Sequence, residues 1–99
     1  MLNLTSTSSI IRLITSAAAN IECHASWVDM TGTTAATAVI QSGSLNNDAI
    51  VTATTTTVVA SPAASTVRNV KGLYITNVST SASSRVAIEH YDGTKAAEL

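Results

Sequence analysis

The chain has almost none of the residues from which small proteins usually draw extra stability. It contains one cysteine, Cys23, so no disulfide can form within the chain, and it has only one proline and four glycines. Phenylalanine is absent, and Trp27, Tyr74 and Tyr91 are the only Trp or Tyr residues. The core of this 99-residue domain must therefore consist mainly of Val, Ile, Leu and Ala, and it would be only marginally stable without partners. We interpret Cys23 as a small buried hydrophobic residue.

Charge is equally scarce. Charged residues make up 11% of the chain and the net charge is -1, whereas soluble domains usually contain about 25% charged residues. Weak repulsion between copies suits a protein that is permanently assembled. The five Lys and Arg residues are scattered, which argues against a nucleic-acid partner. Because the sequence contains neither a signal-peptide pattern nor a long apolar run, we expect no membrane partner and synthesis in the cytoplasm.

The hydrophobic pattern predicts short β-strands. Residues 21–27 alternate between apolar and polar and form the clearest strand, with Trp27 in the core. Residues 10–15 predict a second strand with Arg12 facing outward, although a helix continuing through residues 16–20 fits the pattern too. Residues 50–59 are nearly all β-branched, which favours a strand but defines its register poorly. The Thr-rich face of residues 52–57 would suit a sheet edge or a contact between subunits.

The remaining segments predict less regular structure. Residues 31–48 are expected to form a turn, a weak strand over residues 36–41 and then a polar loop. Further along, alternation along a strand would place Val67, Leu73 and Ile75 on one face and Val70 on the other. We therefore predict a β-bulge near Gly72 that brings the two halves into phase, with Leu73 and Ile75 in the core. A strand over residues 85–91 is followed by Asp92-Gly93, which is typical of a two-residue type I′ hairpin.

Six or seven short strands without a convincing helix predict an all-β, antiparallel sandwich or barrel. Residues 1–9 form a polar arm that we expect to be disordered unless a neighbour holds it, and residues 10–99 form a single β-sandwich domain. The final strand is short. We therefore expect either that another chain covers the strand before it, or that the domain is the anchoring part of a longer chain.

The sequence contains few residues that could form a catalytic or metal-binding site. Glu22 and His24 would share a strand face, but zinc needs further ligands, so we interpret them as surface residues. Asp29 could orient a histidine in a catalytic triad, but the sequence contains no recognisable nucleophile motif. Residues 46–48 could supply oxygen ligands to calcium, although Asn and Asp are also the usual turn residues. We expect no catalytic residues, no metal and no cofactor, and a protein that is not an enzyme.

Several segments together resemble a family of small β domains from tailed bacteriophages and prophages. They are LNLTSTSSIIRLITSAAAN near the start, SWVDMTGTT, the long segment TTVVASPAASTVRNVKGLYITNVST and the later YDGT. They cover most of the chain but contain no catalytic motif. The resemblance implies a β-sandwich of jelly-roll or immunoglobulin-like type, a location in the virion on the capsid surface, and a homo-oligomer, with a trimer as the favoured state.

The resulting hypothesis is a capsid decoration or cement protein that binds the major capsid protein and stabilises the shell. Within the same class, the alternative is a head-fibre or tail-fibre attachment domain. A carbohydrate-binding module is the alternative from another class, and it would need exposed aromatic residues. The candidate contact residues are three threonines and the two tyrosines, namely Thr52, Thr54, Thr56, Tyr74 and Tyr91.

Overall fold

The computed structural model of the protein describes residues 2–32 and 39–99, and the regular structure in these residues is entirely β. The chain runs through eight strands: β1 (Leu2–Leu4), β2 (Ile10–Thr15), β3 (Ile21–Thr31), β4 (Val39–Ile50), β5 (Thr55–Val59), β6 (Thr66–Asn77), β7 (Val86–Tyr91) and β8 (Ala96–Glu98). The expected number was six or seven, and β1 is the strand that the sequence pattern did not reveal.

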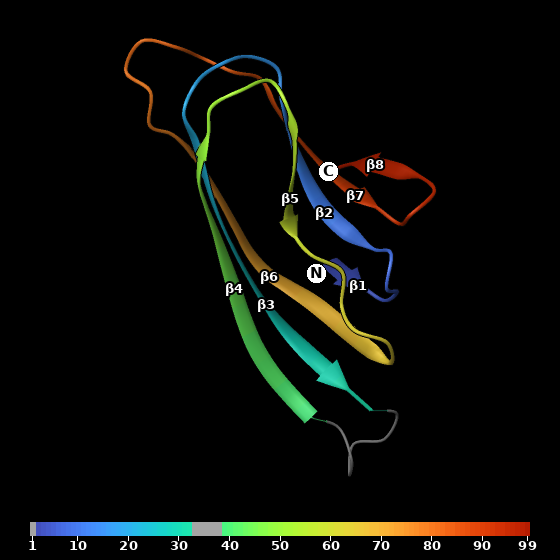
Figure 1. Cartoon of the computed structure of the whole chain (residues 1–99). Helices are drawn as coiled ribbons and strands as arrows, with labels where there is room; N and C mark the ends of the chain where they lie inside the picture. The colour runs from blue at the N-terminus through green and yellow to red at the C-terminus, as the bar shows by residue number, and fades with distance from the viewer. Residues whose placement is uncertain (1, 33–38) are drawn as a thin grey trace.

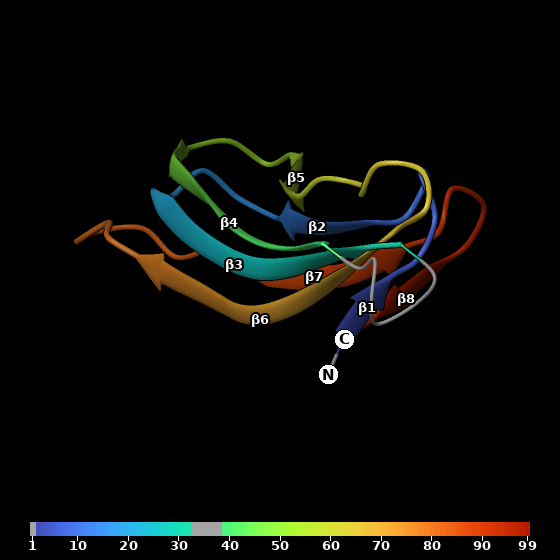
Figure 2. The ribbon, with the colours of Figure 1, turned by 90° about the horizontal axis from the view of Figure 1, so that it is seen from below.

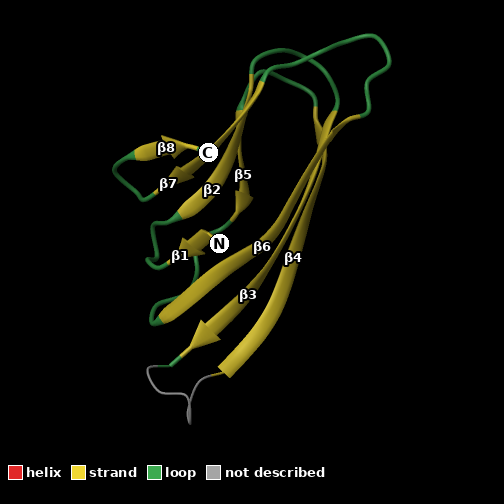
Figure 3. Cartoon of the chain, turned by 180° about the vertical axis from the view of Figure 1, so that it is seen from behind, coloured by secondary structure: helices red, strands yellow, loops and turns green. Residues whose placement is uncertain are grey.

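The strands form two four-stranded antiparallel sheets. One sheet, here called the long sheet, has the order β1-β6-β3-β4, and the other, the short sheet, has the order β5-β2-β7-β8. Figure 2 shows the two layers, with the edge strands β4 and β5 on the same side of the molecule. In Figures 1 and 3, β3, β4 and β6 continue well beyond the short sheet. The predicted all-β antiparallel sandwich is confirmed.

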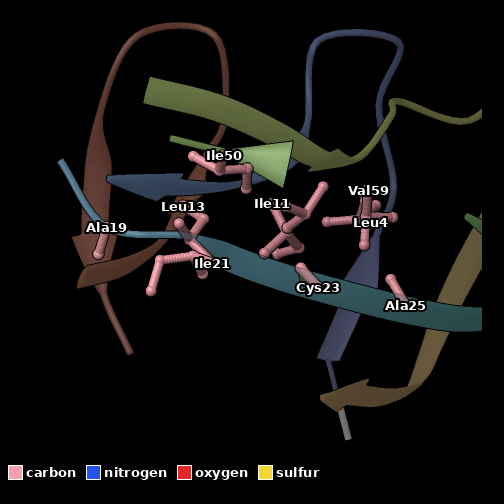
Figure 4. Packing of buried hydrophobic residues seen from close by; sticks show 10 residues of the cluster. Leu4, Ile11, Leu13, Ala19, Ile21, Cys23, Ala25, Ile50 and Val59 are labelled. Atoms are coloured by element: carbon pink, nitrogen blue, oxygen red, sulfur yellow. The ribbon is translucent and has the colours of Figure 1, made fainter. Parts of the chain in front are cut away.

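The core lies where the two sheets overlap. In β3 the predicted alternation is confirmed, because Ile21, Cys23 and Ala25 are buried, and in β2 the buried residues are Ile11 and Leu13 (Figure 4). The remaining buried hydrophobic residues come from other elements, namely Leu4, Ala19, Ile50, Val58 and Val59. Removing each large side chain from water contributes about 1.5–3 kcal/mol, so this cluster is the main source of stability.

The three residues expected in the core, Trp27, Leu73 and Ile75, lie at the margin of the buried cluster. Trp27, Leu73 and Ile75 are half-buried and pack against the buried cluster from one side. For Trp27 the reason is that the core ends near Ala25, beyond which the long sheet projects past the short sheet. Leu73 and Ile75 belong to β6, which the short sheet covers only in part. Sequence alternation identified the inward face of each strand but not how far the second sheet extends over it.

The predicted β-bulge is present in β6. Ser26 of β3 is opposite Gly72, but the next residue, Trp27, is opposite Val70, so Lys71 is the extra residue of the bulge. The bulge reverses the alternation, and this brings both Leu73 and Val70 onto the inner face of the long sheet. Apolar residues of opposite parity in the sequence therefore pack against the same core.

Strand β4 corrects the prediction for residues 43–48. These residues were expected to form a polar loop, but they continue a long strand that pairs with β3 from Thr31↔Val39 to Ile21↔Ile50. Asn, Ser and Gly have low β propensity, yet pairing with a strong neighbouring strand outweighs that preference. Of the weak strand expected over residues 36–41, only residues 39–41 are described, and they belong to β4; residues 36–38 lie outside the described residues.

The Thr-rich segment is divided between the two sheets. Residues 50–59 were expected to form one strand, but β4 ends at Ile50 in the long sheet and β5 begins at Thr55 in the short sheet. The Thr15 hydroxyl group donates a hydrogen bond to the Thr52 carbonyl and accepts one from the Thr54 amide, which holds the crossing segment in place. A strand that changes sheet must interrupt its pairing, and propensity cannot show where.

The N-terminal segment also differs from expectation. The described residues of the predicted disordered arm include β1, which pairs with β6 from Leu2↔Val70 to Leu4↔Arg68. Leu4 is fully buried in the core. Leu2 also packs against the core, so two leucines at the start of a Ser/Thr-rich segment anchor the strand to the sandwich.

The hairpin at Asp92-Gly93 is present, but its turn is not type I′. The turn comprises residues 92–95, with the Asp92 amide donating to the Lys95 carbonyl. Within this turn only Gly93 has a positive φ, 98°, whereas a type I′ turn needs positive φ at both central residues. The Asp92 carboxylate instead accepts hydrogen bonds from the amides of Thr94 and Lys95.

Candidate functional site

The side of the sandwich where β4 and β5 lie next to each other is its most open part. We call it the open flank and define it as strand β4, strand β5 and residues 51–54 between them. Each of the two strands pairs with only one other described strand, β4 with β3 and β5 with β2. The outer backbone edges of β4 and β5 are therefore free to pair with a strand of another molecule.

A groove of about 300 Å³ follows the flank, and it contains the three threonines expected to form a contact surface. Thr52 and Thr54 are exposed in the crossing segment, and Thr56 lies on β5. The opposite wall of the groove is the end of β4, from Asn46 to Ile50. Nδ2 of Asn47 is buried there without a hydrogen-bond partner among the described residues. The structure thus brings the three predicted threonines together at one surface.

Strand β4 adds apolar side chains that the sequence reasoning missed. Val39, Ile40 and Leu45 are 61%, 72% and 40% exposed, although each is a large aliphatic residue. The only charged residue in β4 is Asp48, and the strand contains neither Lys nor Pro, which commonly protect edge strands from pairing. The sequence contained a signal, namely three aliphatic residues in a nearly uncharged segment, but Val39 and Ile40 lay in a strand predicted to be weak and Leu45 lay in the predicted polar loop.

The projecting end of the long sheet is held rigid by a compact cluster around Trp27. The Trp27 ring lies directly over Gly43 of β4, where a Cβ atom would be 2.6 Å from the indole Nε1. The Arg68 guanidinium group lies 4.5 Å from the centre of the Trp27 ring and binds both carboxylate oxygens of Asp29, at 2.9 and 3.0 Å. Arg68 also donates to the carbonyl of Ala60 at 2.7 Å. These contacts connect β3, β4 and β6 to the segment that follows β5.

The two tyrosines have different surroundings. Tyr74 is 67% exposed on the outer face of the long sheet, beside His24. Tyr91 is half-buried on the short sheet, where the Arg12 guanidinium covers its ring at 4.3 Å and its hydroxyl group donates to the Gly93 carbonyl. Arg12 also forms an ion pair with Glu89 at 2.7 Å. Tyr74 therefore remains open to a ligand, while Tyr91 is engaged within the fold.

The residues considered for chemistry do not assemble into a catalytic or metal site. Glu22 and His24 do share the outer face of β3, but the described residues contain no group of three or more His, Cys, Asp and Glu side chains that could hold a metal ion. Asp29 binds Arg68 instead of orienting a histidine. Residues 46–48 belong to a strand and not to a cation-binding loop. Burial raises the pKa of the Cys23 thiol, which favours its unreactive protonated form.

The structure describes no helix long and apolar enough to cross a membrane within residues 2–32 and 39–99. Comparison of the chain with protein-family models, with curated proteins and with solved structures finds no match.

Proposed function

We propose that the protein is a structural component of a virion, a capsid decoration protein that binds the major capsid protein through its open flank and reinforces the shell. The observation that carries this proposal is β4, an edge strand of 12 residues that exposes Val39, Ile40 and Leu45. A strand of this length with a free edge and aliphatic side chains is unfavourable in a protein that stays alone in water. A neighbouring subunit would satisfy both the backbone edge and the apolar side chains.

The flank provides the two components that strand addition requires. Main-chain hydrogen bonds along β4 would supply affinity, and the groove beside Thr52 and Thr54 would receive side chains of the partner. The Arg68-Asp29-Trp27 cluster keeps the projecting strands in place before binding, which lowers the entropic cost of association. Shell stabilisation would then increase with occupancy by mass action.

The scarcity of charge supports the same function. The described residues form two ion pairs, Arg12–Glu89 and Arg68–Asp29, and these involve four of the 11 charged residues of the chain. Few charges then remain to keep copies apart, so we also propose a homo-oligomer, with a trimer as the favoured state. Light scattering coupled to size-exclusion chromatography would measure the number of chains directly. The alternative of a head-fibre or tail-fibre attachment domain predicts a longer polypeptide, which the intact mass of the virion protein would reveal.

Binding to shells tests the proposal. Empty capsids of the virus that encodes the chain should take up the purified protein saturably in a co-sedimentation assay. Leu45→Lys should lower the affinity about tenfold or more, because a lysine on the edge opposes strand pairing and would be buried unpaired. Val78→Lys is the matched control, because Val78 is 41% exposed, close to the 40% of Leu45, but lies outside the flank. Capsids that bind no protein, or that bind both variants equally well, would contradict the proposal.

A further inference from the structure

The outer face of the long sheet carries a second surface feature, which adjoins the groove between β4 and β5 at residues 46–48. It is a shallow depression of about 310 Å³ across β4, β3 and β6, which we call the outer depression. Besides Cys23 and Asn47, the residues that line it are Glu22, His24, Asn46, Asp48, Tyr74 and Thr76. They come from three strands, and the antiparallel register places His24 between Asn46 and Tyr74.

Two aromatic rings form the floor of the outer depression. The centres of the Tyr74 and His24 rings are 6.2 Å apart, with a tilt of 34° between their planes. The Tyr74 ring leans over Gly72, where a Cβ atom would be 3.1 Å from Cε2, so the glycine leaves the ring room to lie against the sheet. The His24 ring is held by a hydrogen bond between its Nδ1 and Oδ1 of Asn46. The platform is thus positioned before any ligand arrives.

The rim of the outer depression carries two acidic and two neutral hydrogen-bonding side chains. Glu22 and Asp48 contribute carboxylates, neither of which takes part in an ion pair within residues 2–32 and 39–99. Asn46 and Thr76 add an amide and a hydroxyl group. Two uncompensated carboxylates repel phosphates and acidic sugars, whereas they accept hydrogen bonds from neutral hydroxyl groups.

We propose that the outer depression binds a neutral saccharide. The C–H face of a sugar ring would stack on Tyr74, and its hydroxyl groups would donate hydrogen bonds to Glu22 and Asp48. Asn46 and Asp48 belong to β4 and so also to the open flank, but Tyr74, which would provide the stacking contact, lies on β6 outside it. A decoration protein with such a site would present a glycan-binding face to the outside while the flank holds it on the shell.

The experiment is a titration of the ¹⁵N-labelled protein with the methyl glycosides of glucose, galactose, mannose and N-acetylglucosamine. At least one of them should shift amide resonances around β3, β4 and β6, and galacturonic acid should not. Tyr74→Ala should weaken binding about tenfold, through loss of stacking, while Tyr74→Phe should retain it. Gly72→Ala should also weaken binding, because the added Cβ displaces the Tyr74 ring.

Met30→Ala is the matched control, because Met30 is exposed on the same face of β3 but does not line the outer depression. The amide spectrum of each variant reports whether it is folded. The proposal is overturned if none of the four glycosides shifts these resonances up to its solubility limit, if the shifts map elsewhere, or if Tyr74→Ala binds as well as the parent. Leu45→Lys should bind sugar normally, so failure of capsid binding and failure of sugar binding are distinguished.

Discussion

Replacing Arg68 by methionine should destabilise the protein more than any other change to a charged side chain. The guanidinium group makes three hydrogen bonds, two to Asp29 and one to the Ala60 carbonyl, and it stacks on Trp27. Arg68→Met retains an apolar stem against the indole ring but leaves the Asp29 carboxylate without its partner. The side chains of Arg68 and Asp29 are only 13% and 20% exposed, so water replaces the lost bonds incompletely.

The magnitude follows from this partial burial. Removing one partner of a fully buried pair costs about 3–5 kcal/mol, and the remaining exposure lowers this to about 2–3 kcal/mol. For a domain of this size, each kcal/mol shifts the melting temperature by about 4–8 °C, so Arg68→Met should melt at least about 8 °C lower. The double variant Asp29→Leu, Arg68→Met should recover more than half of the loss, because it no longer contains an unpaired carboxylate.

Urea unfolding followed by the fluorescence of Trp27, the single tryptophan, measures the free energy of unfolding directly. Arg12→Met is the comparison, since Arg12 binds Glu89 through a single hydrogen bond, whereas Arg68 makes three. It should cost about 1 kcal/mol. A loss below about 0.5 kcal/mol for Arg68→Met, or a larger loss for Arg12→Met, would refute the reasoning.

Three further predictions follow from the fold. Leu4→Ala should lower the free energy of unfolding by about 2–5 kcal/mol in a urea titration, because Leu4 is fully buried; an unchanged midpoint would mean that β1 is not part of the core. Cys23 should react with a thiol reagent near pH 8 only as fast as the protein unfolds, because burial raises the pKa of its thiol; rapid labelling of the folded protein would contradict its buried position. The pKa of Asp92 is lowered by hydrogen bonds from the amides of Lys95 and Thr94. These bonds should therefore stabilise the turn fully at pH values above the ordinary pKa of an aspartate, and the stabilisation should be lost as the pH falls through the lowered pKa. Amide exchange at Thr94 that stayed equally slow on both sides of that range would argue against this role.

The open flank and the outer depression differ in how far the sequence could reveal them. The threonines of the flank were predicted as a contact surface from their strand propensity alone, and the structure places them together in one groove. Leu45 was missed because residues 42–48, rich in Asn, Ser and Gly, predict a loop, and Val39 and Ile40 lay in the weak strand predicted over residues 36–41 without being singled out as a contact surface. The neighbourhood of Tyr74, His24 and Asn46 could not be predicted either, because it depends on the register of three strands.

The sequence by itself determined the all-β class, the inward faces of β2 and β3, and the bulge that reconciles Val70 with Leu73, since each of these follows from alternation along a single strand. Only the tertiary structure decided where the core ends, which strands lie at the edges, and that residues 43–48 form part of β4. The physical reason is that strand pairing and sheet packing join residues far apart in the chain, and their energy outweighs the weak local preferences that a sequence displays.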